Sequence, residues 1–264
     1  AIPILRLGIL KKRSIKEALA KYSNGRLNQS HNTHLPLNYE DGINFSIFRA
    51  SYIPYEVIVM RLCSYVVVCD TGFAPNPFWG LCTLAACTPN HQSLQLKRGD
   101  WLLGNSSAKE GHQLIYAMRV SEVLDFDQYY RDPRFEQKKA SAVDWQHRCG
   151  DNIYFRDSDG QWKQGTAFCH TSPKEIEQDT RYPRVFISDH FFYFGEKAPN
   201  FLGPFASLIQ TSRGCRYADN AETALGFVKW LEETYPPGLH GQPRDRDENP
   251  PSFIQIESSN FSKG

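Results

Sequence analysis

The residues best suited to chemistry stand directly after an apolar run, in the segment 70–80, which reads Asp-Thr-Gly-Phe-Ala-Pro-Asn-Pro-Phe-Trp-Gly. Its two prolines restrict the backbone and so reduce the entropy lost in holding one shape. Rigid aromatic rings with a few directed polar groups suit a planar heterocycle. The segment therefore predicts a slot for a flat ring, lined by Asp70, Phe73, Asn76, Phe78 and Trp79.

The alternative for the same segment is structural, because loop aromatics commonly cover one end of a hydrophobic core. The two interpretations differ in what the rings border. A ligand slot requires an accessible cavity beside Asp70 and Asn76, whereas a core lid buries the rings and leaves no such cavity.

Polar and basic groups elsewhere could complete a nucleotide site. An Asn side chain can pair with two groups on a base edge, the segment 104–107 could present amides and hydroxyls to an anion, and arginines beside tyrosines suit phosphate contact and stacking. Each of these segments is equally compatible with an ordinary surface turn or helix. The further candidate ligand residues are Cys82, Trp101, Asn105, Arg131, Arg134 and Asn152.

Catalysis is a second possibility that the sequence leaves open. Cys149 stands two residues before Asp151 and could be a nucleophile if a base lies nearby, and His190 follows Asp189 where a strand is expected to begin. The predicted catalytic set is Cys149, Asp151 and His190. A buried Cys and a structural His are the alternatives, because Cys often acts as a small apolar residue.

No metal or cofactor is predicted. The cysteines form no Cys-x-x-Cys pair of the kind that binds zinc, and neither a dinucleotide-binding glycine motif nor a P-loop follows a strand. The seven cysteines do not suggest a secreted disulfide framework. No signal peptide and no run of about 20 apolar residues occurs, so we expect a cytoplasmic protein that does not enter a membrane.

The charge pattern argues against a broad DNA-binding face. The formal net charge of the 264 residues is only +1, whereas non-specific DNA binding depends on many Lys and Arg contacts to phosphates. Residues 1–60 hold eight Lys and Arg against four Asp and Glu, so the rest of the chain is slightly acidic. Any nucleic-acid recognition must therefore depend on a local site.

Short strands dominate the elements that must position these residues. The patterns predict strands, helices and one hairpin at the ranges given below, and indicate an α+β fold with a small curved mixed sheet or a barrel, with peripheral helices. We expect strands at 61–70, 81–88, 102–103, 114–123, 185–188 and 191–194, the last two as a pair or one bent strand. We also expect a hairpin at 152–163, short helices at 126–130 and 134–138, and a longer helix after Asp219 or Asn220.

The predicted domain boundaries follow from a change in composition. Met60 directly precedes a strand-like run, so residues 60–238 form the proposed main domain. Residues 1–59 would be an N-terminal extension or a small helical segment, and an ordinary N-terminal subdomain is the alternative. Residues 239–264 are polar and contain proline, which is typical of a loose C-terminal tail.

The chain carries a set of distinctive motifs, of which the first is the longest and most specific. They are Tyr65…Asp70-x-Gly72-Phe-Ala-Pro-Asn-Pro-Phe78, Gly80-x-Cys-Thr-Leu-Ala85, Gly99-Asp-Trp101, Leu114-Ile-Tyr-Ala-Met118, Asp132-Pro-Arg-Phe135, Gly150-Asp-Asn-Ile-Tyr154 and Tyr193-Phe-Gly195. These motifs resemble the nucleotide-modification-associated domain 2 family over about residues 61–198. The resemblance implies a setting in nucleotide or DNA-base modification and gives no mechanism. A weaker resemblance, carried by the segments 99–101 and 114–120, is to PUA-like modules such as EVE and ASCH domains, which are small barrels that hold modified bases.

Three function classes remain open at this point. The leading hypothesis is a protein that recognises a nucleotide or a modified base in nucleic acid. Its rival is a nucleotide- or base-modifying enzyme with Cys82 or Cys149 as nucleophile and Asp151, Asp189 or His190 as acid–base partner. The third is a protein-interaction module in which the aromatic loop is an interface hot spot. The sequence leaves the oligomeric state open.

Overall fold

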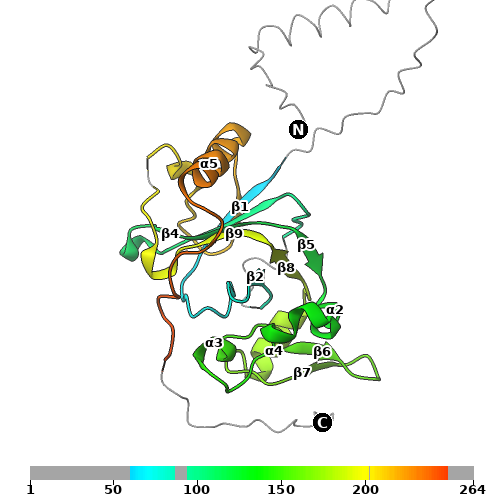
Figure 1. The fold of residues 1–264 in the computed structure, drawn as a ribbon. Coiled ribbons are helices and arrows are strands. Elements are labelled where there is room, and N and C mark those ends of the chain that lie inside the picture. The colour runs from blue at the N-terminus through cyan, green and yellow to red at the C-terminus, as the bar shows by residue number, and fades with distance from the viewer. Residues whose placement is uncertain (1–59, 87–93, 202, 249–264) are drawn as a thin grey trace, which may run out of the picture. The chain divides into compact units, whose positions relative to one another are not determined.

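The computed structural model describes residues 60–86, 94–201 and 203–248. The predicted N-terminal extension and most of the predicted C-terminal tail lie outside these residues. Within them the fold is α+β, with mixed sheets and peripheral helices (Figure 1). The predicted curved mixed sheet is confirmed, and the sheets do not close into a barrel in this part of the chain.

The larger sheet has six strands in the order β10-β1-β3-β4-β9-β11. It is mixed, because β1 runs parallel to β3 and β9 parallel to β11, while the other neighbours are antiparallel. Apolar residues of β1, β3, β4 and β9 form the first core. The strands are β1 (Leu62–Val66), β3 (Trp101–Asn105), β4 (Leu114–Arg119), β9 (His190–Tyr193), β10 (Cys215–Tyr217) and β11 (Gly238–Leu239).

The longest helix, α5 (Ala221–Thr234), covers one face of this sheet (Figure 1). Ala224, Phe227 and Leu231 recur at helical spacing and are all buried in the first core. Asn220 caps the helix by accepting a hydrogen bond from the backbone of Glu222. The predicted helix and one of its two predicted caps are therefore present.

A second, three-stranded sheet has the order β2-β8-β5, and a hairpin of β6 and β7 lies beyond it. The second core forms among this sheet, the hairpin and the short helices. The elements are β2 (Cys82–Leu84), β5 (Glu122–Leu124), β6 (Tyr154–Arg156), β7 (Trp162–Gln164), β8 (Val185–Ser188), α2 (Phe126–Arg131), α3 (Trp145–Arg148), α4 (Pro173–Thr180), and the 3-10 helices η1 (Ala108–Glu110), η2 (Pro133–Lys138), η3 (Gly195–Lys197) and η4 (Ala206–Leu208).

Two corners join the sheets. The run predicted as one strand over 114–123 leaves the larger sheet after Arg119 and enters the smaller one as β5. The run 185–194 crosses in the opposite direction at Asp189, which separates β8 in the smaller sheet from β9 in the larger one. The expected β8–β9 pair is therefore wrong, and the bent-strand alternative is correct. The two corners meet, because the Ser121 hydroxyl donates a hydrogen bond to the Asp189 carboxylate.

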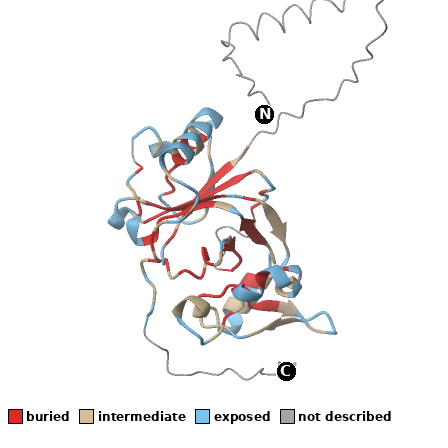
Figure 2. Cartoon of the chain, viewed as in Figure 1, coloured by how far each residue is buried: buried red, intermediate tan, exposed pale blue. Residues whose placement is uncertain are grey.

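The segment from β1 to β2 runs between the two cores, as the cyan chain in the middle of Figure 1 and the red of the same segment in Figure 2 show. Asn76 and Thr83 exchange backbone hydrogen bonds of 2.8 and 2.9 Å, which returns the chain toward β2. Phe73 belongs to the second core. The Pro- and aromatic-rich segment is therefore mostly interior.

Residues after α5 are attached to this interior segment. The backbone amides of Arg244 and Asp245 donate to Asp70 at 3.1 and 2.9 Å, and the Asp245 carboxylate accepts from the Asp70 amide at 2.7 Å. Residues 240–248, which the sequence assigns to a loose tail, thus contact the domain directly. Of the helices in the described ranges, none is long and apolar enough to span a bilayer.

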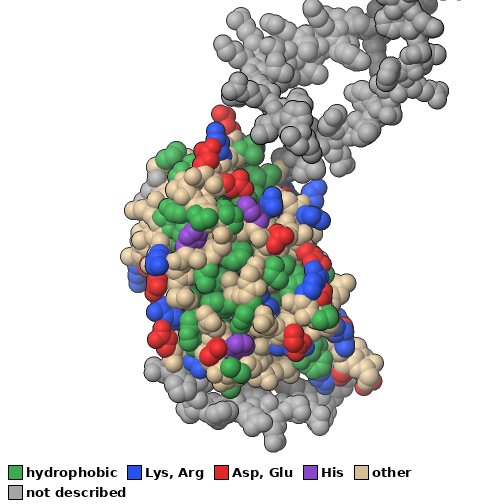
Figure 3. Space-filling view, viewed as in Figure 1, with side chains coloured by type: hydrophobic (Ala, Val, Ile, Leu, Met, Phe, Trp, Pro, Cys, Tyr) green, Lys and Arg blue, Asp and Glu red, His purple; other side chains and the backbone are tan. Residues whose placement is uncertain are grey.

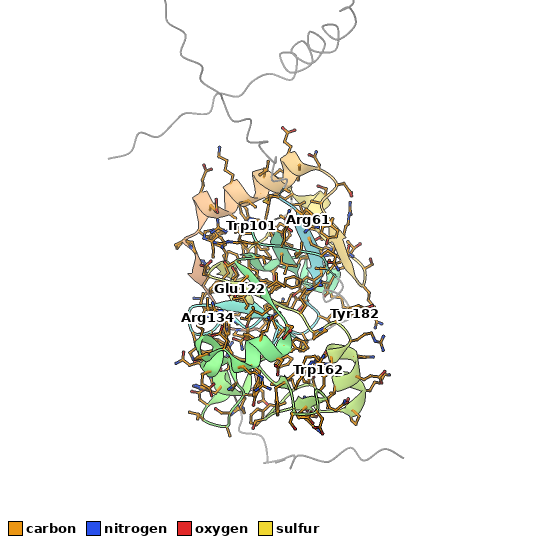
Figure 4. The ribbon with its side chains drawn as sticks, turned by 90° about the vertical axis from the view of Figure 1, so that its right-hand side faces the viewer. Arg61, Trp101, Glu122, Arg134, Trp162 and Tyr182 are labelled. Carbon is orange, nitrogen blue, oxygen red and sulfur yellow. The ribbon has the colours of Figure 1, made fainter. Side chains whose placement is uncertain are left out.

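The Gly-Asp-Trp turn has a structural role. Asp100 is buried and accepts hydrogen bonds from the Arg61 amide and guanidinium at 2.6–3.0 Å, and from the Lys97 amide at 2.9 Å. These bonds fix the start of β1 beside the start of β3, as the positions of Arg61 and Trp101 in Figure 4 illustrate.

We predict that Asp100→Ala destabilises the domain by about 2–4 kcal/mol, because it leaves two backbone amides and a partly buried guanidinium without their buried acceptor. Urea denaturation followed by circular dichroism measures this. Glu136→Ala is the control, since the exposed Glu136–Lys139 pair should contribute less than about 1 kcal/mol. Equal effects of the two substitutions would contradict the prediction.

Candidate functional site

A cavity of about 360 Å³ lies at the corner between the two sheets. We call it the corner cavity. Four parts of the chain meet there: the loop before β2, the short helix α3, the segment around Asp189, and the segment around β11. The lining residues are Pro77, Phe78, Trp79, Gly80, Gln146, Asp189, Phe191, Pro237, Gly238 and Leu239.

Contacts between rings hold the aromatic wall. Phe78 packs edge-on against Trp145 at 5.5 Å between ring centroids and against Trp79 at 5.6 Å. Trp79 also contacts His147 at 5.1 Å. Since Trp145 and His147 both belong to α3, the loop and the helix position each other through their rings. Trp79 is half-buried, so its ring is available in part to a ligand.

Asp189 gives the corner cavity its negative charge. The Ser121 hydroxyl donates to this carboxylate and lowers its pKa below the usual value, and Arg119 contributes to the same shift. The group is therefore ionised at neutral pH and accepts hydrogen bonds only. Among the described residues that line the cavity, none is Lys or Arg. An apolar, aromatic cavity with one carboxylate selects groups that donate hydrogen bonds.

The predicted aromatic set is divided between three places. Phe78 and Trp79 line the corner cavity. Phe73 lies in the second core, 5.1 Å from the His170 ring, and Trp101 lies in the larger sheet, stacked on Phe192 at 6.3 Å. The sequence-based condition for a ligand slot is thus met only in part, because a cavity borders two of the rings but is not lined by Asp70 or Asn76.

The predicted polar ligand residues of the interior contact other parts of the protein. Asp70 accepts from the Tyr193 hydroxyl and the Arg244 amide. Asn105 donates to Gln210 at 2.9 Å, and Asn152 donates to the Tyr129 and Phe135 carbonyls at 3.1 and 3.2 Å. Their predicted ligand contacts stay a prediction, and each side chain has a structural role here.

The two predicted phosphate ligands lie on the surface and are paired with carboxylates. Arg131 bonds Asp127 at 2.9 Å. Arg134 bonds Asp132 and Glu122 at 2.6 and 2.9 Å, and Figure 4 places Arg134 and Glu122 side by side. Charges of both signs are mixed over the face in Figure 3, so the structure offers no broad basic patch on this face.

The three predicted catalytic side chains contact different partners within the described residues. The Cys149 thiol donates to the Thr71 and Trp145 carbonyls, and burial raises its pKa to about 12. Burial likewise raises the pKa of Cys82 to about 12. His190 contacts Glu232 at 2.9 Å. Neither thiol is activated in this state, because a nucleophilic Cys requires a lowered pKa or an adjacent base.

Two polar clusters were missed by the sequence analysis. His170 contacts the buried Asp179 at 2.5 Å, and Tyr154 donates to the same carboxylate at 2.8 Å. The second cluster surrounds Lys138, whose ammonium is fully buried. A lysine at the end of a polar helix gives no signal for burial, because Lys side chains are almost always exposed.

Lys138 and Asp151 form the charged part of that second cluster. Asp151 accepts from Thr83 at 2.7 Å and from Tyr129 at 2.8 Å. Burial raises its pKa to about 6, although these donors and the charge of Lys138 act in the opposite direction. Burial lowers the pKa of Lys138 to about 8. Both groups are therefore charged at neutral pH, and each reduces the cost of burying the other.

The fold and the cavity together define the class of protein to which this chain belongs. This is an α+β domain with an aromatic-walled cavity at the junction of two sheets. The model of the family described as nucleotide modification associated domain 2 matches residues 59–249, so the chain belongs to this family. No curated protein and no solved structure matches the chain. The family resemblance seen in the sequence is confirmed, over a longer range than the motifs covered.

No three His, Cys, Asp or Glu side chains in residues 60–86, 94–201 and 203–248 are grouped in a way that could hold a metal ion. The lining residues offer a ligand of the corner cavity several polar groups, which include the Asp189 carboxylate, the Gln146 amide and the backbone of the lining segments.

The raised pKa of Asp151 predicts how stability depends on pH. The folded protein holds this proton up to about pH 6, whereas the unfolded chain releases it near the ordinary aspartate pKa of 3.8. The contribution of Asp151 to the free energy of unfolding is thus complete below about pH 4 and is lost as the pH rises to about 6. The loss is at most on the order of 3 kcal/mol.

The test is urea denaturation of the wild type and Asp151→Asn between pH 4 and 7. We expect the advantage of the wild type over the variant to fall across this range and then to level off. A difference that stays constant, or that grows with pH, would show that Asp151 is ionised throughout.

Proposed function

We propose that this domain recognises a nucleotide or a modified base of a nucleic acid, and that the base lies in the corner cavity. The observation that carries the proposal is an aromatic-walled cavity of about 360 Å³ in a domain whose family is associated with nucleotide modification. A single stacked base is worth about 1–3 kcal/mol, so Trp79 and Phe78 can provide much of the affinity without a basic surface.

The polar lining indicates which part of a nucleotide would enter. Asp189 accepts hydrogen bonds, so it favours base edges with N–H donors, such as the amino group of cytosine or adenine and the amide and amino groups of guanine. A phosphate would be repelled by the same carboxylate. We therefore propose that the base enters and that the sugar and phosphate stay outside.

The proposal replaces part of the predicted slot. Phe78 and Trp79 keep their role from the sequence analysis, whereas Asp189 and Gln146 take the place of Asp70 and Asn76 as readers of the base edge. The cytoplasmic location and the phosphate contacts of Arg131 and Arg134 remain predictions. The rival, a thiol-dependent modifying enzyme, has less support because burial raises the pKa of both Cys82 and Cys149.

We predict that a thermal-shift screen finds stabilising ligands among deoxynucleosides, 5-substituted deoxycytidines and short single-stranded DNAs that carry them. A ligand present at 100 times its dissociation constant adds about 2.7 kcal/mol to the free energy of unfolding. Trp79→Ala should then weaken binding about 5- to 150-fold in isothermal titration calorimetry, which is the stacking energy of one base expressed as a ratio of dissociation constants.

Matched substitutions outside the corner cavity test whether binding depends on the cavity itself. Trp162 is also half-buried but lies on β7, so Trp162→Ala should leave binding within about 2-fold. Asp189→Asn should weaken the binding of bases that carry an exocyclic amino group more than the binding of thymine, which has none, while Asp159→Asn in the β6–β7 turn should change neither. If no probe stabilises the protein, or if Trp162→Ala matters as much as Trp79→Ala, the proposal fails.

A further inference from the structure

The Lys138 side chain bonds both ends of the loop that forms the aromatic wall. The Lys138 ammonium donates to the carbonyl of Asn76 at 2.9 Å and to the carbonyl of Leu81 at 2.8 Å. A third bond of 2.7 Å reaches the Asn76 side-chain oxygen. We call residues 76–81 the wall loop. It includes four residues of the cavity lining, Pro77 to Gly80.

The wall loop has few hydrogen bonds of its own. Besides the bridge between Asn76 and Thr83, the loop backbone makes a bond of 3.3 Å from Phe78 to the Asn76 side chain and a long bond of 3.5 Å from Leu81 to Phe78. Trp79 adopts a positive φ of 57°, which is unfavourable for a residue with a side chain. The loop therefore needs external contacts to keep this conformation.

Asn76 extends the same connection to the opposite wall. Its side-chain amide donates to the Cys149 carbonyl at 2.8 Å, directly after α3. The helix α3 carries Gln146, which lines the corner cavity, and Trp145 and His147, which contact the aromatic wall. Lys138 thus contacts one wall directly and the other through a single intervening side chain.

We propose that Lys138 is a positioning residue that holds the wall loop and α3 in the arrangement that accepts a base. This inference rests on the proposed function and adds to it a residue that does not touch the ligand. Three acceptors converge on the Nζ atom, and an ammonium group has three N–H donors to match them. No uncharged side chain of similar length can satisfy all three.

The position of Lys138 next to Asp151 explains how the charge is tolerated. Asp151 attracts the ammonium, and its own oxygens are occupied by Thr83 and Tyr129. The Thr83 backbone is bonded to Asn76, so the two charged groups are linked through the base of the wall loop. A continuous buried hydrogen-bond network therefore connects Lys138 to Asp151, and the Lys138 ammonium bonds the wall loop directly.

A purely structural role is the competing explanation, since removing any member of a buried network destabilises a protein. Tyr129 separates the two explanations. Its hydroxyl donates to Asp151 within the same network, and no hydrogen bond from its side chain reaches the wall loop among the described residues. Tyr129→Phe should lower stability without moving the loop.

The experiment compares Lys138→Met with Tyr129→Phe. In Lys138→Met we expect the deoxynucleoside found by the thermal-shift screen to bind at least 10-fold more weakly, and amide hydrogen exchange in residues 76–81 to be at least 10-fold faster relative to β3 and β4. In Tyr129→Phe we expect binding within about 2-fold and no selective change of exchange in the wall loop. Lys139→Met, at the neighbouring partly exposed lysine, should match the wild type in both measurements.

Asn76→Ala provides a second variant if Lys138→Met does not fold. It removes one of the three acceptors and the bond to Cys149, and should give smaller effects of the same sign. Unchanged exchange in the wall loop of whichever variant folds would overturn the positioning role. If the wild type binds no probe at all, the proposed function fails, and the exchange measurement still decides whether Lys138 orders the loop.

Discussion

A polar backbone segment runs through the interior of this domain, and each of its buried groups needs a hydrogen-bond partner. Residues 70–81 lie mostly buried between two hydrophobic cores, and apart from the bridge at Asn76 they belong to no strand. Distant parts of the chain supply hydrogen-bond partners. Asp245 bonds the Asp70 amide, Lys138 bonds the Asn76 carbonyl, and Asp151 bonds the side-chain hydroxyl of Thr83. The C-terminal segment, η2 and the loop after α3 therefore all bond to this interior segment or to β2 directly after it.

This need for hydrogen-bond partners explains why the buried charges of Lys138 and Asp151 lie beside the loop that lines the corner cavity. An interior loop that must expose one aromatic face cannot be held by apolar packing alone, because its carbonyl groups would remain unsatisfied. The buried Lys138 ammonium satisfies two of these backbone carbonyls and the Asn76 side-chain oxygen at once. The loop can then present Phe78 and Trp79 to the corner cavity while its other side stays bonded to the interior. The shape of the corner cavity and the folding of the loop therefore depend on one network.

Local sequence signals determined much of the fold. Ala224, Phe227 and Leu231 recur at helical spacing after a capping residue, and this pattern alone places α5. The turn residues 157–160 place the β6–β7 hairpin. A Val- and Tyr-rich run marks β1, and the apolar run from Leu114 marks β4. The family motifs identified the class, and the segment 70–80 drew attention to Phe78 and Trp79. These features depend on residues close in sequence, so they can be read from the sequence alone.

Contacts between distant segments decided the rest. Whether β8 and β9 pair with each other or belong to two sheets depends on a corner at Asp189, which no local pattern specifies. Burial of Asp70 and Asn76 depends on Asp245, Arg244 and Lys138, which are 62–175 residues away along the chain. The sequence by itself determined the elements, the family and the aromatic character of the site. The tertiary structure decided which rings and which carboxylate line a cavity, because side-chain exposure is a property of the packed chain.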